Sequence, residues 1–423
     1  MSNNRFILVI ITAIFCLTMI PTAYASSNES LVLSQKQAIE LAVKQNNEIK
    51  ELEKDIAIAE EQLKEAEADF YPNIDLNSNY SKSGGDSGSS LYSLALEFQQ
   101  SLYQGGLLKN SYEIAKKNIE VAKFELEVKK KEVKAEVVAE YYDILKTKKM
   151  VNLYNKTVTK NQDYLRIAQA NREAGISTNT DVLKAKISLN QAKQDLLEAE
   201  HSLELNKLTL KNTLGLASNS GLELSEELNW KKEEINFEEA MEYAFLYRAD
   251  IKMLYIEEEI ATINLDNARA NKSPSLNLSG GYDASDDKLK ISDGVWSAAL
   301  TLSYNLFDGG ANNSKVEQAR KELEKYEVQR DELENNIELE IRTQILNLSE
   351  AEESIKLMGL TLKEAEDNLS QTELKYQKGI VASYDVLEAQ TTYQEVQTDY
   401  YEAIYIYNVT LANLDKVMGK KIN

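Results

Sequence analysis

Apolar and small residues recur at two different spacings in this chain. In the longer stretches they step alternately by three and four residues, as in the series Leu189, Ala192, Leu196, Ala199, Leu203, Asn206, Leu210 and Thr213 and the series Val316, Ala319, Leu323, Tyr326, Leu333 and Ile337. A sustained 3.5-residue repeat predicts long helices packed as left-handed coiled coils. Only three prolines occur in 423 residues, so few positions interrupt such helices.

Four shorter segments alternate apolar and polar residues instead. They cover residues 74–80, 92–98, 276–282 and 296–306. This period of two predicts strands with one apolar and one polar face. The first strand of each pair follows Pro72 or Pro274. We expect these prolines to mark the strand starts, because proline cannot continue the preceding helix.

Aromatic residues lie near the ends of these segments, among them Tyr80, Tyr92, Trp296 and Tyr304. Strands of ~10 residues that are apolar outside and polar inside, with aromatic girdles, are typical of a transmembrane β-barrel around water. A small soluble sheet with one wetted face would explain any single segment. Four segments of the same polarity favour the barrel.

The same order of segments occurs twice. Ala38, Ile49, Ala66, Ala68 and Pro72 return 202 positions later, and Gly105, Gly106, Gly175, Asp181, Ala185 and Gly215 return 204 positions later. Solenoid repeats run ~20–50 residues, so this period is too long for one. We predict a duplicated unit that builds one pseudo-symmetric body. Repeat 1 covers residues 31–216, an equatorial linker covers 217–234, and repeat 2 covers 235–420.

The predicted helix lengths set the architecture. In repeat 1 we expect a first helix over Ser34–Phe70, a long helix from Gly106 to about Ala170, and a last helix over Thr180–Leu214. At 1.5 Å per residue the long helix spans ~96 Å, and the other two placed end to end match it. Each repeat would form a wall two helices wide and about 100 Å tall, with strands at one end.

The strands also predict the oligomer. Four strands cannot close into a barrel, and open strand edges are not tolerated in lipid. Two copies would give a barrel of about eight strands, whose interior is filled by side chains. Three copies would give about twelve strands, enough for a pore. We therefore predict a homotrimer.

The first 25 residues form a separate segment. Arg5 precedes an apolar run from Phe6 to Ile20, and Ala23-Tyr24-Ala25 provides a cleavage site, so we predict a secretory signal peptide cleaved after Ala25. An uncleaved anchor would need ~20 apolar residues. Cys16 lies within the apolar run, a poor context for lipoprotein processing. It is the only cysteine, which excludes disulfides, thiolate metal sites and cysteine nucleophiles from the mature chain.

The net charge and the single histidine exclude several classes of partner and of active site. The chain carries 48 Lys and Arg against 69 Asp and Glu, a net charge of −21, which argues against nucleic acid and anionic membrane surfaces as partners. Two explanations fit this acidity. The acidic residues keep long exposed helices soluble, or they line the lumen of a channel that prefers cations. His201 is the only histidine and lacks a second histidine or cysteine for a metal site. We expect no enzyme activity, no catalytic residues, no cofactor and no metal.

The ordered set of motifs resembles the TolC-type outer-membrane efflux proteins, also called the outer-membrane factor family. The resemblance runs from about Leu31 to Gly419. It rests on the duplication and on four local motifs, at residues 68–73 before the first strand, 306–310 before the second long helix, and 175–183 and 379–387 at the tips of the helical hairpins.

The resemblance implies a mainly α fold with a transmembrane β-barrel section, assembled as a trimeric α/β-barrel duct. Such a duct sits in the outer membrane and extends into the periplasm. It is the exit of a tripartite efflux pump or a type I secretion system, and its partners are a periplasmic adaptor, an inner-membrane transporter and outer-membrane lipid. The sequence does not specify the cargo.

Two alternatives remain. A periplasmic adaptor also has a long helical hairpin, but it has only one, flanked by compact Gly- and Val-rich β domains. A coiled-coil envelope scaffold without a pore would explain the helices but leaves the amphipathic strands without a purpose.

The hairpin tips are the candidate functional site. From the residues alone, Gly175 and Gly379 would end a helix in left-handed geometry. Thr180 or Asp181, and Ser383 or Asp385, would then cap the next helix. Plain turns between helices would look the same. The resemblance implies that the tips contact the adaptor, through Gly175, Ile176, Ser177, Thr180, Gly379, Ile380, Val381 and Ser383.

The resemblance also implies a closable entrance. Asp385 and Glu388 match an acidic ring, and Tyr376 and Asp181 match residues that hold the entrance shut. Val381 occupies the place where some members of the family carry an arginine for this lock. The sequence therefore does not predict an ionic part of this lock.

Overall fold

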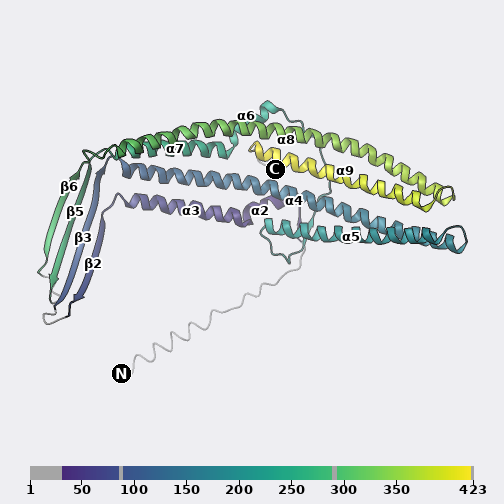
Figure 1. The fold of residues 1–423 in the computed structure, drawn as a ribbon, viewed down its shortest axis with the longest axis horizontal. Coiled ribbons are helices and arrows are strands. Elements are labelled where there is room, and N and C mark those ends of the chain that lie inside the picture. Colours follow the sequence, from purple (N-terminus) through teal and green to yellow (C-terminus); the bar gives the residue numbers. More distant parts are fainter. Residues whose placement is uncertain (1–30, 85–88, 288–292, 421–423) are drawn as a thin grey trace, which may run out of the picture.

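The computed structural model describes residues 31–84, 89–287 and 293–420, so the predicted signal peptide lies outside the described residues. The protomer is elongated, with a four-stranded sheet at one end and two helical hairpin tips at the other (Figure 1). Within the described ranges, no helix is both long enough and apolar enough to cross a membrane.

The two repeats have the same elements. Repeat 1 contains α2 (Gln35–Gln45), α3 (Asn47–Ala68), β2 (Asn73–Lys82), β3 (Ser90–Gln104), α4 (Leu107–Glu173) and α5 (Asn179–Thr213). Repeat 2 contains α6 (Phe237–Tyr247), α7 (Ala249–Ala270), β5 (Ser275–Asp286), β6 (Val295–Ser303), α8 (Ala311–Gln377) and α9 (Ser383–Val417). Equivalent helices have equal lengths of 11, 22, 67 and 35 residues. The predicted duplication is confirmed.

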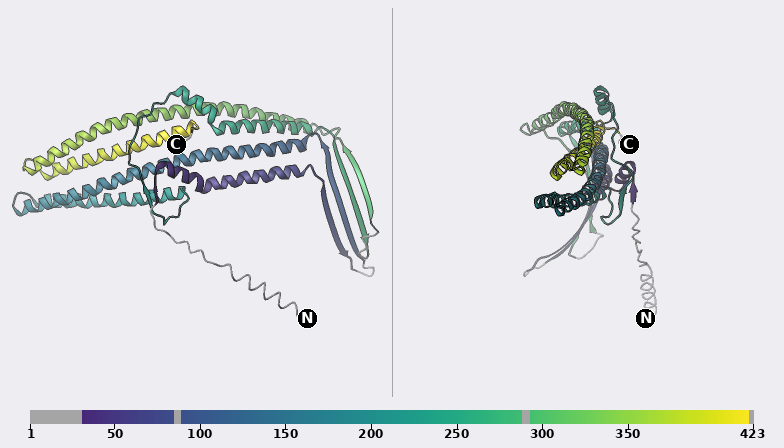
Figure 2. Two further views of the ribbon diagram at one scale, coloured as in Figure 1. Left: turned by 180° about the vertical axis from the view of Figure 1, so that it is seen from behind. Right: turned by 90° about the vertical axis from the view of Figure 1, so that its right-hand side faces the viewer.

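The long helices form two antiparallel hairpins, α4 with α5 and α8 with α9, which lie side by side along the molecule (Figure 2). Each 67-residue helix is about 100 Å long at 1.5 Å per residue. The predicted heptad positions Leu189, Ala192 and Ala199 are buried in the first hairpin, and Ala403 and Tyr407 are buried in the second. The coiled-coil prediction is therefore confirmed for these hairpins.

The predicted single helix over Ser34–Phe70 is wrong, because the chain breaks at Asn46 into α2 and α3. The Asn46 side-chain oxygen accepts hydrogen bonds from the backbone of Glu48 (2.9 Å) and Ile49 (3.2 Å), and its amide donates to the Thr213 carbonyl (2.9 Å). These bonds satisfy the free backbone donors of a new helix start. They also tie the break to the end of α5.

Repeat 2 breaks at the equivalent place, Arg248, between α6 and α7. The Arg248 guanidinium donates to the Val417 carbonyl (3.2 Å) and pairs with Asp250 (2.6 Å) and Glu340 (2.8 Å). Different side chains thus stabilise the equivalent helix break in the two repeats.

Two apolar clusters lie where these breaks meet the long helices. In repeat 1, Tyr141 and Leu210 are fully buried, and the Tyr141 hydroxyl donates to the Leu33 carbonyl (3.1 Å). In repeat 2, the Tyr407 hydroxyl donates to the Lys231 carbonyl (2.8 Å) and its ring packs against Trp230. These bonds hold β1 (Leu31–Leu33), its parallel partner β4 (Leu222–Leu224) and the segment that links the repeats across the helices.

The sheet is antiparallel in the order β2-β3-β5-β6, so the two repeats meet at the β3–β5 pair. One row of paired residues contains Leu76, Leu96, Tyr282 and Trp296, and the adjacent row on the opposite face contains Asp75, Glu97, Gly281 and Ser297. The register thus brings the apolar positions onto one face, as the alternating sequence predicts. The strand bounds differ from the prediction, since β3 continues to Gln104 and β6 ends at Ser303, before Tyr304 and Leu306.

Candidate functional site at the hairpin tips

Each long helix ends at a glycine in left-handed geometry. Gly175 has φ +74° and Gly379 has φ +70°. Gly175 donates to the Arg172 carbonyl (3.0 Å) and the next residue, Ile176, donates to the Asn171 carbonyl (2.8 Å). Gly379 and Ile380 make the equivalent bonds in repeat 2. This pattern satisfies the last carbonyls of a helix, and it leaves Ile176 and Ile380 77% and 67% exposed at the ends of the hairpins.

The N-cap residue of α5 is Thr178 rather than Thr180 or Asp181, and Asp181 accepts a free backbone donor from the third helical position. The Thr178 hydroxyl accepts from the Asp181 backbone N–H (3.3 Å), and the Asp181 carboxylate accepts from the Thr178 N–H (2.9 Å). This reciprocal arrangement is a capping box, in which the side chain of the third helical residue accepts a hydrogen bond from the backbone N–H of the cap residue. The same bonds from Thr178 lower the pKa of the Asp181 carboxyl.

The second tip lacks a capping side chain, because the residue before α9 is Ala382 rather than Ser383 or Asp385. The Asp385 carboxylate accepts from the Ala382 backbone N–H (2.9 Å). Asp385 therefore satisfies one free donor from inside the helix, while its side chain stays exposed at the tip. At both tips the aspartate at the third helical position, Asp181 or Asp385, accepts a hydrogen bond from the backbone N–H of the residue before the helix.

The two tips lie against each other. The Lys184 amine sits 5.1 Å from the centroid of the Tyr384 ring, which connects the start of α5 to the start of α9. Between the two helices runs a groove of about 410 Å³, lined by Lys184, Ile187, Ser188, Tyr384, Leu387, Glu388, Thr391 and Thr392. Glu388 thus lines the groove together with Lys184, its own equivalent in repeat 1.

Tyr376, the last tyrosine of α8, is half-buried beside the first hairpin. Burial raises the pKa of its phenol, the charge of Asp181 raises it further, and a hydrogen bond with Asn171 acts in the opposite direction. Tyr376 thus lies within electrostatic range of Asp181 on the other hairpin.

A second link between the hairpins lies one helical turn before Tyr376. The Glu373 carboxylate of α8 accepts from the Lys160 amine (2.7 Å) and from the Tyr164 hydroxyl (2.6 Å), both on α4. Burial and the negative charge of Glu373 raise the pKa of the Tyr164 phenol. The sequence shows Lys160 and Tyr164 four residues apart on one helix face, but it carries no sign of a partner in the other repeat.

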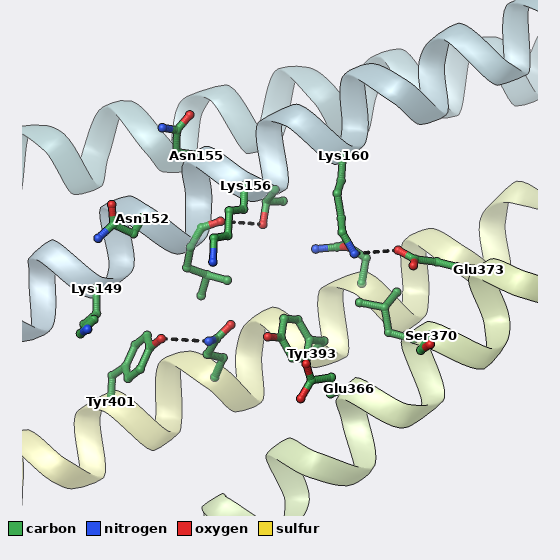
Figure 3. A pocket seen from close by; sticks show the side chains of 15 residues that line it. Lys149, Asn152, Asn155, Lys156, Lys160, Glu366, Ser370, Glu373, Tyr393 and Tyr401 are labelled. Carbon is green, nitrogen blue, oxygen red and sulfur yellow. Dashed lines mark hydrogen bonds and ion pairs between the residues drawn. The ribbon is translucent and has the colours of Figure 1, made fainter. Parts of the chain in front are cut away.

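Lys160 and Glu373 of this link also line a polar groove of about 620 Å³ between the hairpins (Figure 3). The labelled residues come from α4 on one side and from α8 and α9 on the other, and they are Lys149, Asn152, Asn155, Lys156, Lys160, Glu366, Ser370, Glu373, Tyr393 and Tyr401. Gln390 is buried in this groove, and among the described atoms its side-chain oxygen has no hydrogen-bond partner. Over the described ranges no group of three or more His, Cys, Asp or Glu residues could hold a metal ion.

Comparison with known proteins gives concordant results. A model of the outer membrane efflux protein family matches residues 38–216 and 243–420. Outer membrane protein TolC of Escherichia coli (strain K12) is 27% identical over 181 residues, which cover 39% of this chain and 37% of TolC. The matched region therefore spans little more than a third of that relative.

Solved structures with a similar fold cover nearly the whole chain. The CmeC outer membrane channel of Campylobacter jejuni has a TM-score of 0.80 at 16% identity, over 91% of this chain and 85% of that one. The open state of the MtrE outer membrane channel of Neisseria gonorrhoeae has a TM-score of 0.76 at 19% identity, over 92% and 89% of the two chains. At such identities the similarity establishes the fold alone.

Proposed function

The chain belongs to the outer membrane efflux protein family, and from this we propose that it is one subunit of an outer-membrane exit duct. The duct takes substrates at the helical tips in the periplasm and releases them at the sheet end, beyond the outer membrane. It acts as a passage and catalyses no reaction. The observation that carries this proposal is the separation of the two ends by helices about 100 Å long.

The proposed membrane part is a β-barrel shared by three copies. One chain supplies four strands in an open sheet, and open edges are not tolerated in lipid. Three copies supply about twelve strands, enough to enclose water. The row with Leu96 and Trp296 then faces lipid, and the row with Glu97 and Ser297 faces the lumen.

The proposed periplasmic entrance is formed by the hairpin tips. Ile176 and Ile380 offer apolar contacts to a periplasmic adaptor, together with the glycines and hydroxyl residues beside them. Asp385 and Glu388 are both exposed and lie one helical turn apart. Three copies would gather these carboxylates around one opening, where they produce a negative potential that favours cations.

The proposed lock holds the second hairpin against the first. It consists of the approach of Tyr376 to Asp181 and of the Glu373 cluster with Lys160 and Tyr164. Val381 supplies no charge, so the ion pair in this lock is the one between Glu373 and Lys160. Adaptor binding would have to move the hairpins apart to widen the entrance.

Reconstitution of the purified mature protein into planar lipid bilayers tests the function. We expect discrete single-channel currents with a preference for cations. Choice of cargo belongs to an inner-membrane transporter, because a duct lines its substrate's path without fitting it closely. Stable trimers that give no conductance, with and without an adaptor, would contradict the proposal and support a scaffold.

A further inference from the structure

The polar groove between the hairpins is large enough to hold a small molecule. Its volume is about 620 Å³, and its lining residues belong to α4, α8 and α9 of a single chain. Pockets that bind small organic ligands typically measure ~300–1,000 Å³. A molecule in this groove would contact both hairpins at once.

The α4 wall of the groove is basic. Lys149, Lys156 and Lys160 are separated by seven and four residues, so they lie on one face of the helix. Lys156 and Lys160 point from α4 towards the opposite hairpin (Figure 3). The other α4 residues that line the groove are uncharged. Ammonium groups bind carboxylates and phosphates through charge-assisted hydrogen bonds, so this wall favours an anionic group.

One of these three ammonium groups is available to a ligand. Lys149 pairs with Glu227, and Lys160 pairs with Glu373 at 2.7 Å. Lys156 is exposed and forms no ion pair with any described residue. The anionic part of a ligand would therefore bind at Lys156.

The α8 side of the groove supplies two carboxylates, against the three lysines of the α4 side. Glu373 already accepts hydrogen bonds from Lys160 and Tyr164. Glu366 is exposed. The lining therefore carries one positive charge in excess, which an anionic ligand would neutralise.

The α9 wall offers hydrogen-bond acceptors that lack donors. Gln390 is 4% exposed, and its side-chain oxygen has no partner among the described atoms. The side-chain oxygen of Gln397 is buried and unpartnered as well, while its amide nitrogen donates to the Tyr401 hydroxyl (2.9 Å). Buried polar atoms are almost always hydrogen-bonded in folded proteins. Both oxygens thus require donors that the described chain does not supply.

The coiled coil itself does not require this polar wall. Gln390, Tyr393, Gln397 and Tyr401 line the groove, and their equivalents in repeat 1 are Lys186, Leu189, Lys193 and Leu197. Leu189 is buried in an ordinary apolar cluster with Val158. The partly buried rings of Tyr393 and Tyr401 add apolar surface beside the two amides.

We infer that this groove binds a small hydroxylated anion, namely a sugar acid or a sugar phosphate. Its anionic group pairs with Lys156, its hydroxyl groups donate to the oxygens of Gln390 and Gln397, and its carbon frame packs against Tyr393. The inference goes beyond the proposed function. All the residues that it uses belong to one chain, so the site does not depend on the assembly of a duct.

Other classes of ligand satisfy only part of the lining. A sulfate ion would pair with Lys156, but it has no hydrogen to donate to the oxygens of Gln390 and Gln397. An organic cation would supply donors, but it would meet three ammonium groups on the α4 wall. A neutral sugar would supply the donors and leave Lys156 without a counterion.

Isothermal titration calorimetry of the mature protein in detergent tests the ligand class. The probes are gluconate and glucose 6-phosphate, which distinguish a carboxylate from a phosphate, with glucose and sulfate as controls. We expect at least one anionic sugar to bind about tenfold more tightly than either control, because each control lacks one set of contacts. Absence of binding by both anionic sugars, or equal binding of either control, would overturn the inference.

Substitution of Gln390 tests the location of the site. Gln390→Leu removes the buried acceptor and should weaken binding of the anionic sugar about tenfold. It should not lower the denaturant midpoint, because the substitution removes a buried oxygen that has no partner. Gln394→Leu is the matched control, since Gln394 lies on the same helix outside the groove. Equal affinities of the two variants would place the ligand elsewhere and overturn the inferred site.

An exposed position keeps the test decisive if Gln390→Leu fails to fold. Lys156→Gln removes the proposed counterion and should also weaken binding about tenfold. Lys363→Gln, at an exposed lysine of α8 outside the groove, is its control and should bind like the parent. Unchanged affinity of Lys156→Gln would overturn the assigned role of the basic wall.

Discussion

Asp385 combines two roles at the level of single residues. It accepts the Ala382 backbone N–H, and it leaves a carboxylate exposed at the tip. The sequence indicates its place after the tip glycine, but the resemblance to the family, rather than the residue pattern, suggests a role in the entrance. A substitution that keeps the hydrogen bond and removes the charge separates the two roles.

The double variant Asp385→Asn, Glu388→Gln should assemble normally, because asparagine retains a side-chain oxygen for the cap. It should show weaker cation selectivity and weaker block by multivalent cations in planar bilayers, since the negative potential at the opening is lost. Asp181→Asn, which removes a charge with the same bond at the other tip, should change selectivity less, because Lys184 stands where repeat 2 has Glu388. A normal trimer with unchanged selectivity would leave Asp385 as a helix cap only.

Glu373 is the site residue that sequence reasoning missed, because its partners Lys160 and Tyr164 lie in the other repeat. Glu373→Gln removes the ion pair and weakens the bond from Tyr164. We expect larger or more frequent open-channel currents than in the parent. Glu366→Gln, in the same groove, is the control and should leave the currents unchanged. Equal behaviour of the two variants would remove Glu373 from the lock.

Glu140 links stability to pH. Burial raises the pKa of its carboxyl to about 7, the charges of Glu136 and Asp143 add to this, and a hydrogen bond from Thr213 opposes it. Between pH 4.5 and 7 the folded chain therefore holds a proton that the unfolded chain has lost, so stability falls as pH rises through this window. After allowance for solvent screening the change is on the order of 1–3 kcal/mol.

Glu140→Gln should remove this dependence, and Gln344 already occupies the equivalent position in repeat 2. The measurement is the denaturant midpoint of the parent and the variant at pH 5 and pH 8. The parent should lose stability at the higher pH while the variant changes little. Parallel curves for the two proteins would show that Glu140 stays ionised in the folded state.

At the scale of elements, the apolar spacing of the sequence predicts the helices whose bounds depend on local packing. The predicted long helix from Gly106 to about Ala170 corresponds to α4, and the helix over Thr180–Leu214 corresponds to α5, which spans Asn179–Thr213. The break at Asn46 was missed because the apolar spacing continues through it. Its cause is a hydrogen bond to Thr213, far away in the sequence. The end of β6 was also missed, because the alternating pattern continues to Leu306 while the strand ends at Ser303.

The faces of the strands give a prediction at the same scale. Leu300 pairs with Leu278 on the apolar face, and Ser297 pairs with Gly281 on the polar face. Leu300→Arg or Leu94→Arg should impair membrane assembly, because arginine at mid-bilayer on the lipid face costs ~2–4 kcal/mol. Ser297→Arg should assemble. The check is the amount of each trimer in outer-membrane fractions, and equal amounts would mean that the assigned faces are wrong.

At the scale of the whole molecule, the duplication explains the architecture. Each repeat places a strand pair at one end and a hairpin tip at the other, so one chain spans from a sheet to two helical tips. Sequence reasoning could predict this because the two copies keep the same order and lengths. The helix break inside each repeat could not be predicted in the same way, since Asn46 stabilises it in repeat 1 and Arg248 stabilises it in repeat 2, with different chemistry.

The central claim is that three copies form one duct through the outer membrane. The most direct measurement is the protein mass of the particle extracted from outer membranes in mild detergent, determined by size-exclusion chromatography with multi-angle light scattering. The account predicts a protein mass three times that of one mature chain. A stable monomer, or recovery of the protein only in the soluble periplasmic fraction, would contradict it.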